Sequence, residues 1–91
     1  MMYKIEYTSQ AISEVKYLKK TDTAAYKKLQ SLLHELIDHP YTGTGKPEMM
    51  KYEYTGYYSR RITQKHRLIY QVNEDVVTVF ILSILGHYED K

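Results

Sequence analysis

The sequence predicts an α+β domain in which a pair of helices packs on one face of a largely antiparallel sheet. Three observations predict this class. One short alternating strand comes first, two amphipathic helical segments follow it, and a second half rich in β-favouring residues and turns completes the chain. The expected order is β-α-α-β-β-β-β. Because there is no repeat, low-complexity tract or linker, residues 1–91 are expected to form a single domain.

The first half is expected to hold one strand and a helical pair. Apolar and polar residues alternate over residues 2–7, as in a half-buried strand. A cap residue at Thr8 or Ser9 then begins a helix that ends near Lys20, where cations suit the negative end of the helix dipole. The apolar positions of this helix are Ile12, Val15 and Leu18.

A second helix is expected directly afterwards. Thr21 and Asp22 can cap its first turn, and Pro40 prevents its continuation. Its apolar stripe consists of Leu29, Leu32, Leu33, Leu36 and Ile37. Spacings of three and four place this stripe on one helix face, which must be covered by a flat partner.

That partner is predicted to be a sheet built from the second half. Residues 41–47 form a loop with two glycines and one proline, and the expected strands lie near 49–54, 57–63, 67–72 and 76–85. The turns between them are expected at Gly56, at 64–66 and at 73–75. The last strand is apolar on both faces, so it is predicted to lie inside the sheet.

Composition excludes several function classes. The chain has no cysteine, which rules out a disulfide framework and a thiolate metal site. The first residues lack the apolar run of a signal peptide, and no segment approaches the roughly 20 apolar residues of a membrane span. A soluble cytoplasmic protein without membrane association is therefore expected.

Charge and tyrosine are both concentrated in one segment. Residues 44–70 hold six cations and two anions, whereas the rest of the chain holds seven cations and nine anions. Five of the eleven tyrosines also lie in this segment. Each tyrosine alone is more simply a strand residue, and basic hairpins are common. Together, however, interleaved cations and flat rings favour a single-stranded nucleic acid as partner.

A few side chains could support RNA cleavage without a metal. The reaction needs a base for the ribose 2′-hydroxyl, an acid for the departing 5′ oxygen and cations for the phosphorane charge. The candidates are Glu48, Arg60, Arg61, Arg67 and His87. Taken singly, Glu48 is more simply a surface acid and His87 a terminal polar residue. Arg60 and Arg61 alternate along a strand, so only one of them can face a given RNA.

Metal and nucleotide sites are not indicated by the sequence. His34 and His39 are five residues apart, which misses the spacing of a helical metal pair. The loop containing Lys46 lacks the Gly-Lys-Ser/Thr ending of a phosphate-binding loop. For His66 we predict a role in a turn or in packing.

Four motifs carry a family resemblance. They are Gly43-Thr44-Gly45-Lys46-Pro47-Glu48, Tyr58-Ser59-Arg60-Arg61-Ile62-Thr63, His66-Arg67-Leu68-Ile69-Tyr70 and the terminal His87-Tyr88. In order, spacing and distance from the C-terminus, this pattern resembles the YoeB/Txe branch of the RelE toxin superfamily, which has a RelE/ParE toxin-like, microbial ribonuclease-like fold. The resemblance extends from the first strand to Tyr88, after which this chain continues with Glu89-Asp90-Lys91 where several relatives end.

The resemblance implies a role for each residue of the site. Glu48 would be the general base, Arg67 would stabilise the phosphate in the transition state, and His87 would be the general acid. Tyr88 would support catalysis. The residues expected to contact RNA or its phosphates are Lys51, Arg61, Tyr57 and Tyr58, of which the two tyrosines stand where relatives often carry Phe-Trp. Neither a cofactor nor a metal is implied.

The resemblance also implies partners. Members of this branch cut messenger RNA in the decoding site of the ribosome, next to 16S rRNA, and a cognate YefM-like antitoxin neutralises them. Homodimerisation is compatible with the pattern.

Two other functions stay open on the sequence. One is a non-catalytic toxin of the ParE kind, which blocks a protein target; the joint presence of Glu48, Arg67 and His87 disfavours it, because a binder needs no acid–base pair. The other is a small RNA-binding or structural module whose matching residues are inactive. RNA binding without cleavage by the intact chain would support that alternative.

Overall fold

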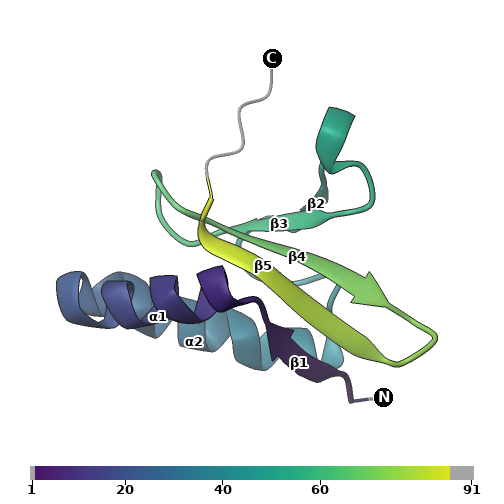
Figure 1. The fold of residues 1–91 in the computed structure, drawn as a ribbon, viewed down its shortest axis with the longest axis horizontal. Helices are drawn as coiled ribbons and strands as arrows, with labels where there is room; N and C mark the ends of the chain where they lie inside the picture. Colours follow the sequence, from purple (N-terminus) through teal and green to yellow (C-terminus); the bar gives the residue numbers. More distant parts are fainter. Residues whose placement is uncertain (1, 87–91) are drawn as a thin grey trace.

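Two helices cover one face of a five-stranded sheet in a computed structural model that describes residues 2–86 (Figure 1). In chain order the elements are β1 (Lys4–Tyr7), α1 (Ser9–Thr21), α2 (Thr23–Asp38), β2 (Glu48–Met49), the 3₁₀ turn η1 (Tyr52–Tyr54), β3 (Tyr58–Arg61), β4 (Arg67–Asn73) and β5 (Thr78–Gly86). The predicted α+β class and element order are confirmed. Neither helix of the described part of the chain has the length and apolar character needed to cross a membrane.

The strands lie side by side in the order β1-β5-β4-β3-β2. β1 runs parallel to β5, and the other three pairs are antiparallel. β5 therefore has a partner on both edges, as predicted from a strand that is apolar on both faces. β2 and β1 form the two edges of the sheet, so the short strand that begins at Glu48 is open to solvent on one side.

The helix boundaries follow the predicted caps. The Thr8 hydroxyl accepts a hydrogen bond from the Ala11 amide at 3.0 Å and begins α1. The Asp22 carboxylate accepts one from the Ala25 amide, also at 3.0 Å, and begins α2. Such a cap typically contributes about 1 kcal/mol to helix stability. Since Asp22 is the only residue between the two helices, they turn sharply into a hairpin.

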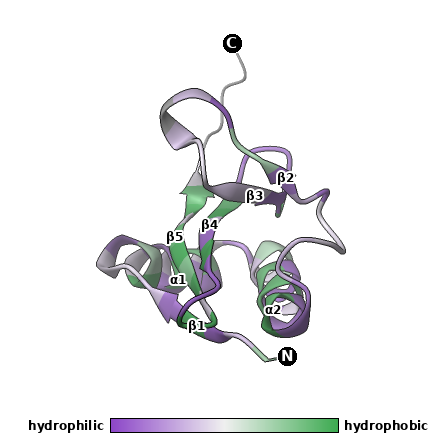
Figure 2. Cartoon of the chain, turned by 90° about the vertical axis from the view of Figure 1, so that its right-hand side faces the viewer, coloured by the Kyte–Doolittle hydropathy of each residue, from purple (hydrophilic) through white to green (hydrophobic). Residues whose placement is uncertain are grey.

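The core lies between this helical hairpin and the sheet. Figure 2 shows β5 and much of β4 in hydrophobic colours, with the two helices beside them. The buried cluster comprises Ala11, Leu18, Ala25, Leu29, Leu32, Leu36, Ile62, Leu68, Tyr70, Val79, Ile81 and Ile84. The leucine stripe of α2 is confirmed. In α1, however, Ile12 is 46% exposed, because Ala11 and Leu18, seven residues apart, turn the buried face away from it.

The strand predicted near 49–54 is mostly wrong. Only Glu48 and Met49 pair with β3, and the chain then forms η1. Tyrosine and threonine favour strands, but the Met50 amide donates to the Tyr57 carbonyl at 2.8 Å and closes the segment between them into a turn.

The last strand begins two residues later than predicted. The Asn73 side chain accepts hydrogen bonds from the amides of Asp75 and Val76, and Val77 has a positive φ of 46°. This local turn chemistry overrides the β preference of the two valines, so β5 begins at Thr78.

Candidate active site

Strand pairing brings three of the predicted site residues, Glu48, Arg61 and Arg67, onto one face of the sheet. Glu48 on β2 is opposite Ser59 on β3, and Arg61 on β3 is opposite Arg67 on β4. Directly opposite residues, and residues two apart on one strand, share a face. Because Arg60, between Ser59 and Arg61, contacts α2, the face that carries Glu48, Arg61 and Arg67 is the one turned away from the helices.

Glu48 and Arg67 form the centre of this face. A carboxylate oxygen of Glu48 lies 3.9 Å from a guanidinium nitrogen of Arg67, and the two side chains are 57% and 24% exposed. This separation is longer than a hydrogen bond, and an ion pair this open to water contributes little to stability. Both groups therefore keep most of their capacity to contact a ligand.

The loop before β2 fixes the start of that strand. The Arg61 amide donates to the Gly45 carbonyl at 2.7 Å, which aligns the loop with β3 just before Glu48. Gly45 has φ +86°, and a side-chain Cβ built there would lie 3.0 Å from the Arg61 carbonyl oxygen. Glycine satisfies both demands, because it has no Cβ and accepts a positive φ.

The end of β5 reaches the same place. Gly86, the last residue of β5, is paired with Arg67. The predicted acid His87 and the supporting Tyr88 follow it directly in the chain, and both lie outside the described residues.

Glu14 on α1 holds the end of β5. Its carboxylate accepts hydrogen bonds from the amides of Ile84 at 2.9 Å and Leu85 at 3.2 Å. The register between β4 and β5 is irregular at this point, so two successive amides of β5 reach the same carboxylate. Sequence analysis missed this residue, since a glutamate in a helix gives no local signal of a contact 70 residues away.

We expect Glu14→Ala to lower the free energy of unfolding by about 1–3 kcal/mol, because it leaves two part-buried amides without their acceptor. Urea denaturation followed by circular dichroism measures this loss. Ser13→Ala, an exposed change on the same helix, is the control and is expected to stay within about 0.5 kcal/mol of the parent. Equal stability of the two variants would contradict a supporting role for Glu14.

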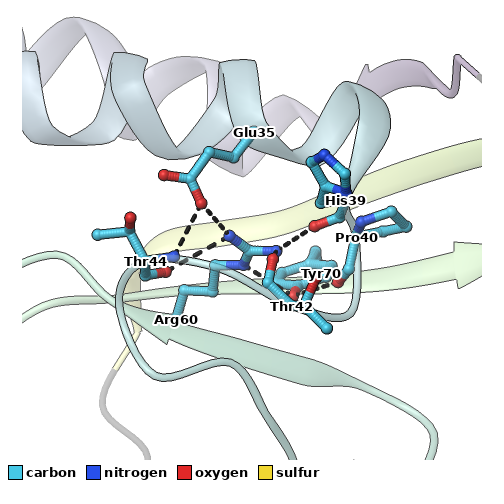
Figure 3. A network of polar contacts seen from close by, with 7 residues as sticks. All are labelled: Glu35, His39, Pro40, Thr42, Thr44, Arg60 and Tyr70. Atoms are coloured by element: carbon cyan, nitrogen blue, oxygen red, sulfur yellow. Dashed lines mark hydrogen bonds and ion pairs between the residues drawn. The ribbon is translucent and has the colours of Figure 1, made fainter.

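Arg60 is buried and forms the polar centre of the fold (Figure 3). Its guanidinium donates to the Glu35 carboxylate at 3.0 Å, to the Tyr70 hydroxyl at 3.1 Å and to the backbone carbonyls of His39, Thr42 and Thr44. These contacts join the end of α2 and the following loop to β3 and β4. Arg60 is thus excluded from the open face, in agreement with the prediction that only one of the two arginines can face RNA.

Glu35 completes this centre. It accepts the Thr44 amide at 2.8 Å as well as Arg60, and its side chain is 27% exposed. Hydrogen bonds from Thr44, followed by the charge of Arg60, lower the pKa of the Glu35 carboxyl against an opposing effect of desolvation. Desolvation raises the pKa of the Tyr70 phenol, which Arg60 partly offsets.

The other predicted RNA contacts differ in their placement. Lys51 is exposed and stands at the start of η1, and Tyr57 is half-buried directly before β3. The Tyr58 ring stacks on Tyr70 with centroids 5.9 Å apart and meets the edge of Tyr41 at 5.3 Å. Tyr58 therefore lies on the helix side of the sheet, opposite to Glu48 and Arg67.

Metal-binding groups are dispersed in this fold. Among residues 2–86, no three histidine, aspartate or glutamate side chains lie together in a way that could hold a metal ion. His66 lies in the β3–β4 turn, where its amide donates to the Thr63 hydroxyl at 3.1 Å.

The fold and the charged open face define the class of protein. The helical hairpin on one face of a five-stranded mixed sheet superimposes on the YoeB/ParE toxin from Agrobacterium tumefaciens with a TM-score of 0.87 at 30% identity, covering 93% of this chain and 99% of that one. A match to the model of the YoeB-like toxin of bacterial type II toxin–antitoxin systems spans residues 7–88. The chain therefore belongs to the family of YoeB-like toxins.

Individual relatives agree with this assignment. Toxin YoeB of Escherichia coli strain K12 is 34% identical over 85 residues, which cover 93% of this chain and 99% of the relative. The YoeB dimer from Staphylococcus aureus is 37% identical with a TM-score of 0.84, and it covers 97% of this chain and 100% of its own. The heterotetrameric YoeB–YefM toxin–antitoxin complex from the same organism superimposes with a TM-score of 0.81 at 37% identity and the same coverage.

Proposed function

We propose that this YoeB-like toxin is an endoribonuclease that cuts messenger RNA in the decoding site of the ribosome and thereby inhibits translation. The observation that carries the proposal is the Glu48–Arg67 pair: an exposed carboxylate 3.9 Å from a partly exposed guanidinium on the open face of the sheet. A base next to a phosphate-binding cation is what attack by a ribose 2′-hydroxyl requires. In a binding module, these two groups would have no such task.

The proposed reaction assigns one task to each group. Glu48 takes the proton from the 2′-hydroxyl as its oxygen bonds to the adjacent phosphorus. Arg67 holds the nonbridging phosphate oxygens, for which its planar fork is suited. His87 protonates the 5′ oxygen as the bond to phosphorus breaks, and Tyr88 supports the site. The products are a 2′,3′-cyclic phosphate and a 5′-hydroxyl, and no metal or cofactor takes part.

The residues around this pair would bind the RNA strand. Arg61 is exposed and opposite Arg67, so two cations stand side by side on adjacent strands. Lys51 and Tyr57 lie at the two ends of the turn that joins β2 to β3. Because Tyr58 packs on Tyr70 on the other side of the sheet, its proposed contribution is to hold β3 in place rather than to stack on a base.

The partners of the toxin are proposed on the same basis. A YefM-like antitoxin with an acidic segment would cover the basic open face. The Staphylococcus aureus relative has been solved in a heterotetrameric complex with YefM. We expect that segment to contact Arg61, Arg67 or His87 or to block access to them. A homodimer is proposed from the dimeric relative, and the cytoplasm is proposed as the location because ribosomes and messenger RNA are there.

Primer extension in a purified bacterial translation reaction tests the proposal. We expect cuts within codons of a translated message, absent when the same RNA is incubated without ribosomes. The fragments are expected to carry 5′-hydroxyl and 2′,3′-cyclic phosphate ends, which ligation by end-specific enzymes distinguishes from hydrolytic ends. Inhibited translation without any cut would refute the nuclease and favour a ParE-like toxin that blocks a protein target.

A further inference from the structure

Two tyrosine rings project from the turn that follows Glu48. Tyr52 is 68% exposed, Tyr54 is 36% exposed, and the nearby Met49 is 56% exposed. Single exposed apolar side chains are common on protein surfaces and need no explanation. Met49 is opposite Tyr58 and so belongs to the helix side of the sheet. The two exposed rings, two positions apart, form a local cluster that begins four positions after the proposed general base.

The backbone of this turn is held by several hydrogen bonds. The Thr55 amide and hydroxyl donate to the Tyr52 carbonyl at 3.0 and 2.6 Å. The Tyr57 amide donates to the Tyr54 carbonyl at 3.0 Å. Met50, only 2% exposed, anchors the base of the turn to the body of the protein. The two rings are therefore presented on a fixed support.

Tyr52 is in a conformation that a bulky residue rarely adopts. Its φ is +60°, in the left-handed region that favours glycine and asparagine. Backbone strain of this kind is concentrated at ligand-binding sites. Because glycine or asparagine would serve the turn better, the turn itself does not account for tyrosine at this position.

The turn that carries the two rings stands on the same side of the sheet as the proposed active site. In Figure 1 the teal η1 turn rises from the sheet on the side opposite α1 and α2. Tyr52 is four positions after Glu48, so their Cα atoms are at most about 14 Å apart. Stacked nucleotides follow one another at about 3.4 Å along a strand, so a separation of about 14 Å corresponds to about four nucleotides of an RNA strand. Lys51, next to Tyr52, adds a cation for its phosphates.

We propose that Tyr52 and Tyr54 form a stacking platform for an unpaired base of the RNA strand that flanks the cut. The proposal rests on the nuclease function and names the surface that holds the strand beside the reacting phosphate. An aromatic face accepts any base, so the platform contributes affinity and alignment without selecting a sequence.

Binding of a non-cleavable RNA tests the platform. The probe is a short single-stranded oligonucleotide with 2′-O-methyl groups throughout, a 5′ fluorophore for anisotropy and, in a second version, 2-aminopurine in place of one base. Stacking on one ring is worth about a tenfold change in Kd. We expect Tyr52→Leu to weaken binding by about that factor and to reduce the quenching of 2-aminopurine, whereas Tyr52→Phe keeps both.

The controls distinguish a loss of stacking from a loss of folding or of a phosphate contact as the cause of weaker RNA binding. Phenylalanine and leucine are equally strained at φ +60°, so they differ in the ring alone. Tyr17→Leu changes a tyrosine that is 57% exposed on α1, on the other side of the sheet, and is expected to bind like the parent. The slope of log Kd against log salt is expected to stay unchanged in Tyr52→Leu, because no phosphate contact is lost. Tyr54→Leu provides a second, independent variant.

The outcomes are distinct. A parent protein that cuts translated message and binds the probe, with Tyr52→Leu and Tyr54→Leu binding equally well, would overturn the platform and leave the nuclease intact. A loss of affinity in Tyr52→Phe equal to that in Tyr52→Leu would also overturn it, since the hydroxyl rather than the ring would then be responsible. A parent protein that neither binds nor cuts RNA would refute the nuclease itself.

Discussion

Glu48→Ala is expected to slow RNA cleavage by about a hundred- to ten-thousand-fold, because a positioned general base typically contributes that much to the rate. The same loss is expected for His87→Ala, which removes the proposed acid. Single-turnover cutting of a translated message, quantified by primer extension, measures both rates. Full activity in either folded variant would remove that residue from the mechanism.

The fold of Glu48→Ala is expected to be intact, which makes the rate informative. Glu48 is more than half exposed and its contact with Arg67 is long, so its ion pair adds little to stability. Glu6 on β1 is a matched control: it is also on an edge strand, 49% exposed, and 3.8 Å from the Lys4 ammonium. We expect Glu6→Ala to cut at the parental rate and both variants to unfold at the parental urea concentration.

Much of the fold could be predicted because its signals are local. Thr8 and Asp22 are cap residues, and Leu29, Leu32 and Leu36 recur at the helical period. Helix starts and buried helix faces depend on residues within a few positions of each other, so a single sequence contains them. The β-rich second half was likewise apparent, since its strands and most of its turns have distinct compositions.

The errors arose where tertiary contacts or turn chemistry outweighed composition. A strand was predicted near residues 49–54, yet the hydrogen bond from the Met50 amide to the Tyr57 carbonyl closes the segment between them into a turn. Val76 is β-favouring but lies in a turn that the Asn73 side chain organises. Ile12 fits the apolar spacing of α1 and still faces solvent, because its neighbour Ala11 is small enough to face the core instead.

The candidate site was predicted only partly by physical reasoning. The basic, tyrosine-rich segment indicated a nucleic-acid partner, but the choice of Glu48, Arg67 and His87 came from the resemblance. The register adds what the sequence could not, namely that Glu48 and Arg67 approach each other although they are 19 positions apart. The roles of Glu14 and Glu35 depend on contacts across 70 and 25 residues, and for such distances a single sequence has no signal.

Arg60→Met is expected to lower the free energy of unfolding by about 3–5 kcal/mol, because it removes a buried guanidinium and leaves the part-buried Glu35 carboxylate without its partner. Methionine fills a similar volume but donates no hydrogen bond, so the carbonyls of His39 and Thr42 lose their donor. Urea denaturation measures the loss. Arg61→Met makes the same chemical change at the next residue, which is exposed, and is expected to cost no more than about 0.5 kcal/mol.

The Glu35 carboxylate, which pairs with Arg60, makes the free energy of unfolding depend on pH. Because the pKa of Glu35 is lower in the folded protein, its contribution to stability is fully present above the unfolded value of about 4.3 and is lost as the pH falls through the folded value. Glu35→Gln is expected to cost about 1.5–3 kcal/mol at neutral pH, the range for hydrogen bonds to charged groups. Its stability difference from the parent should then narrow below about pH 4. A difference independent of pH would mean that the Glu35 charge does not stabilise the fold.

Two adjacent arginines are thus expected to have different roles: Arg60 stabilises the fold, and Arg61 binds RNA. Arg60 is fully buried, holds the end of α2 and the following loop on the sheet, and reaches no ligand. Arg61 is exposed beside Arg67, and its loss should weaken RNA binding and reduce the salt dependence of the affinity while leaving the unfolding curve unchanged. Alternation along β3 is the physical cause, since successive side chains on a strand must point to opposite faces. If Arg61→Met unfolds as easily as Arg60→Met, this division of roles between the two faces is wrong.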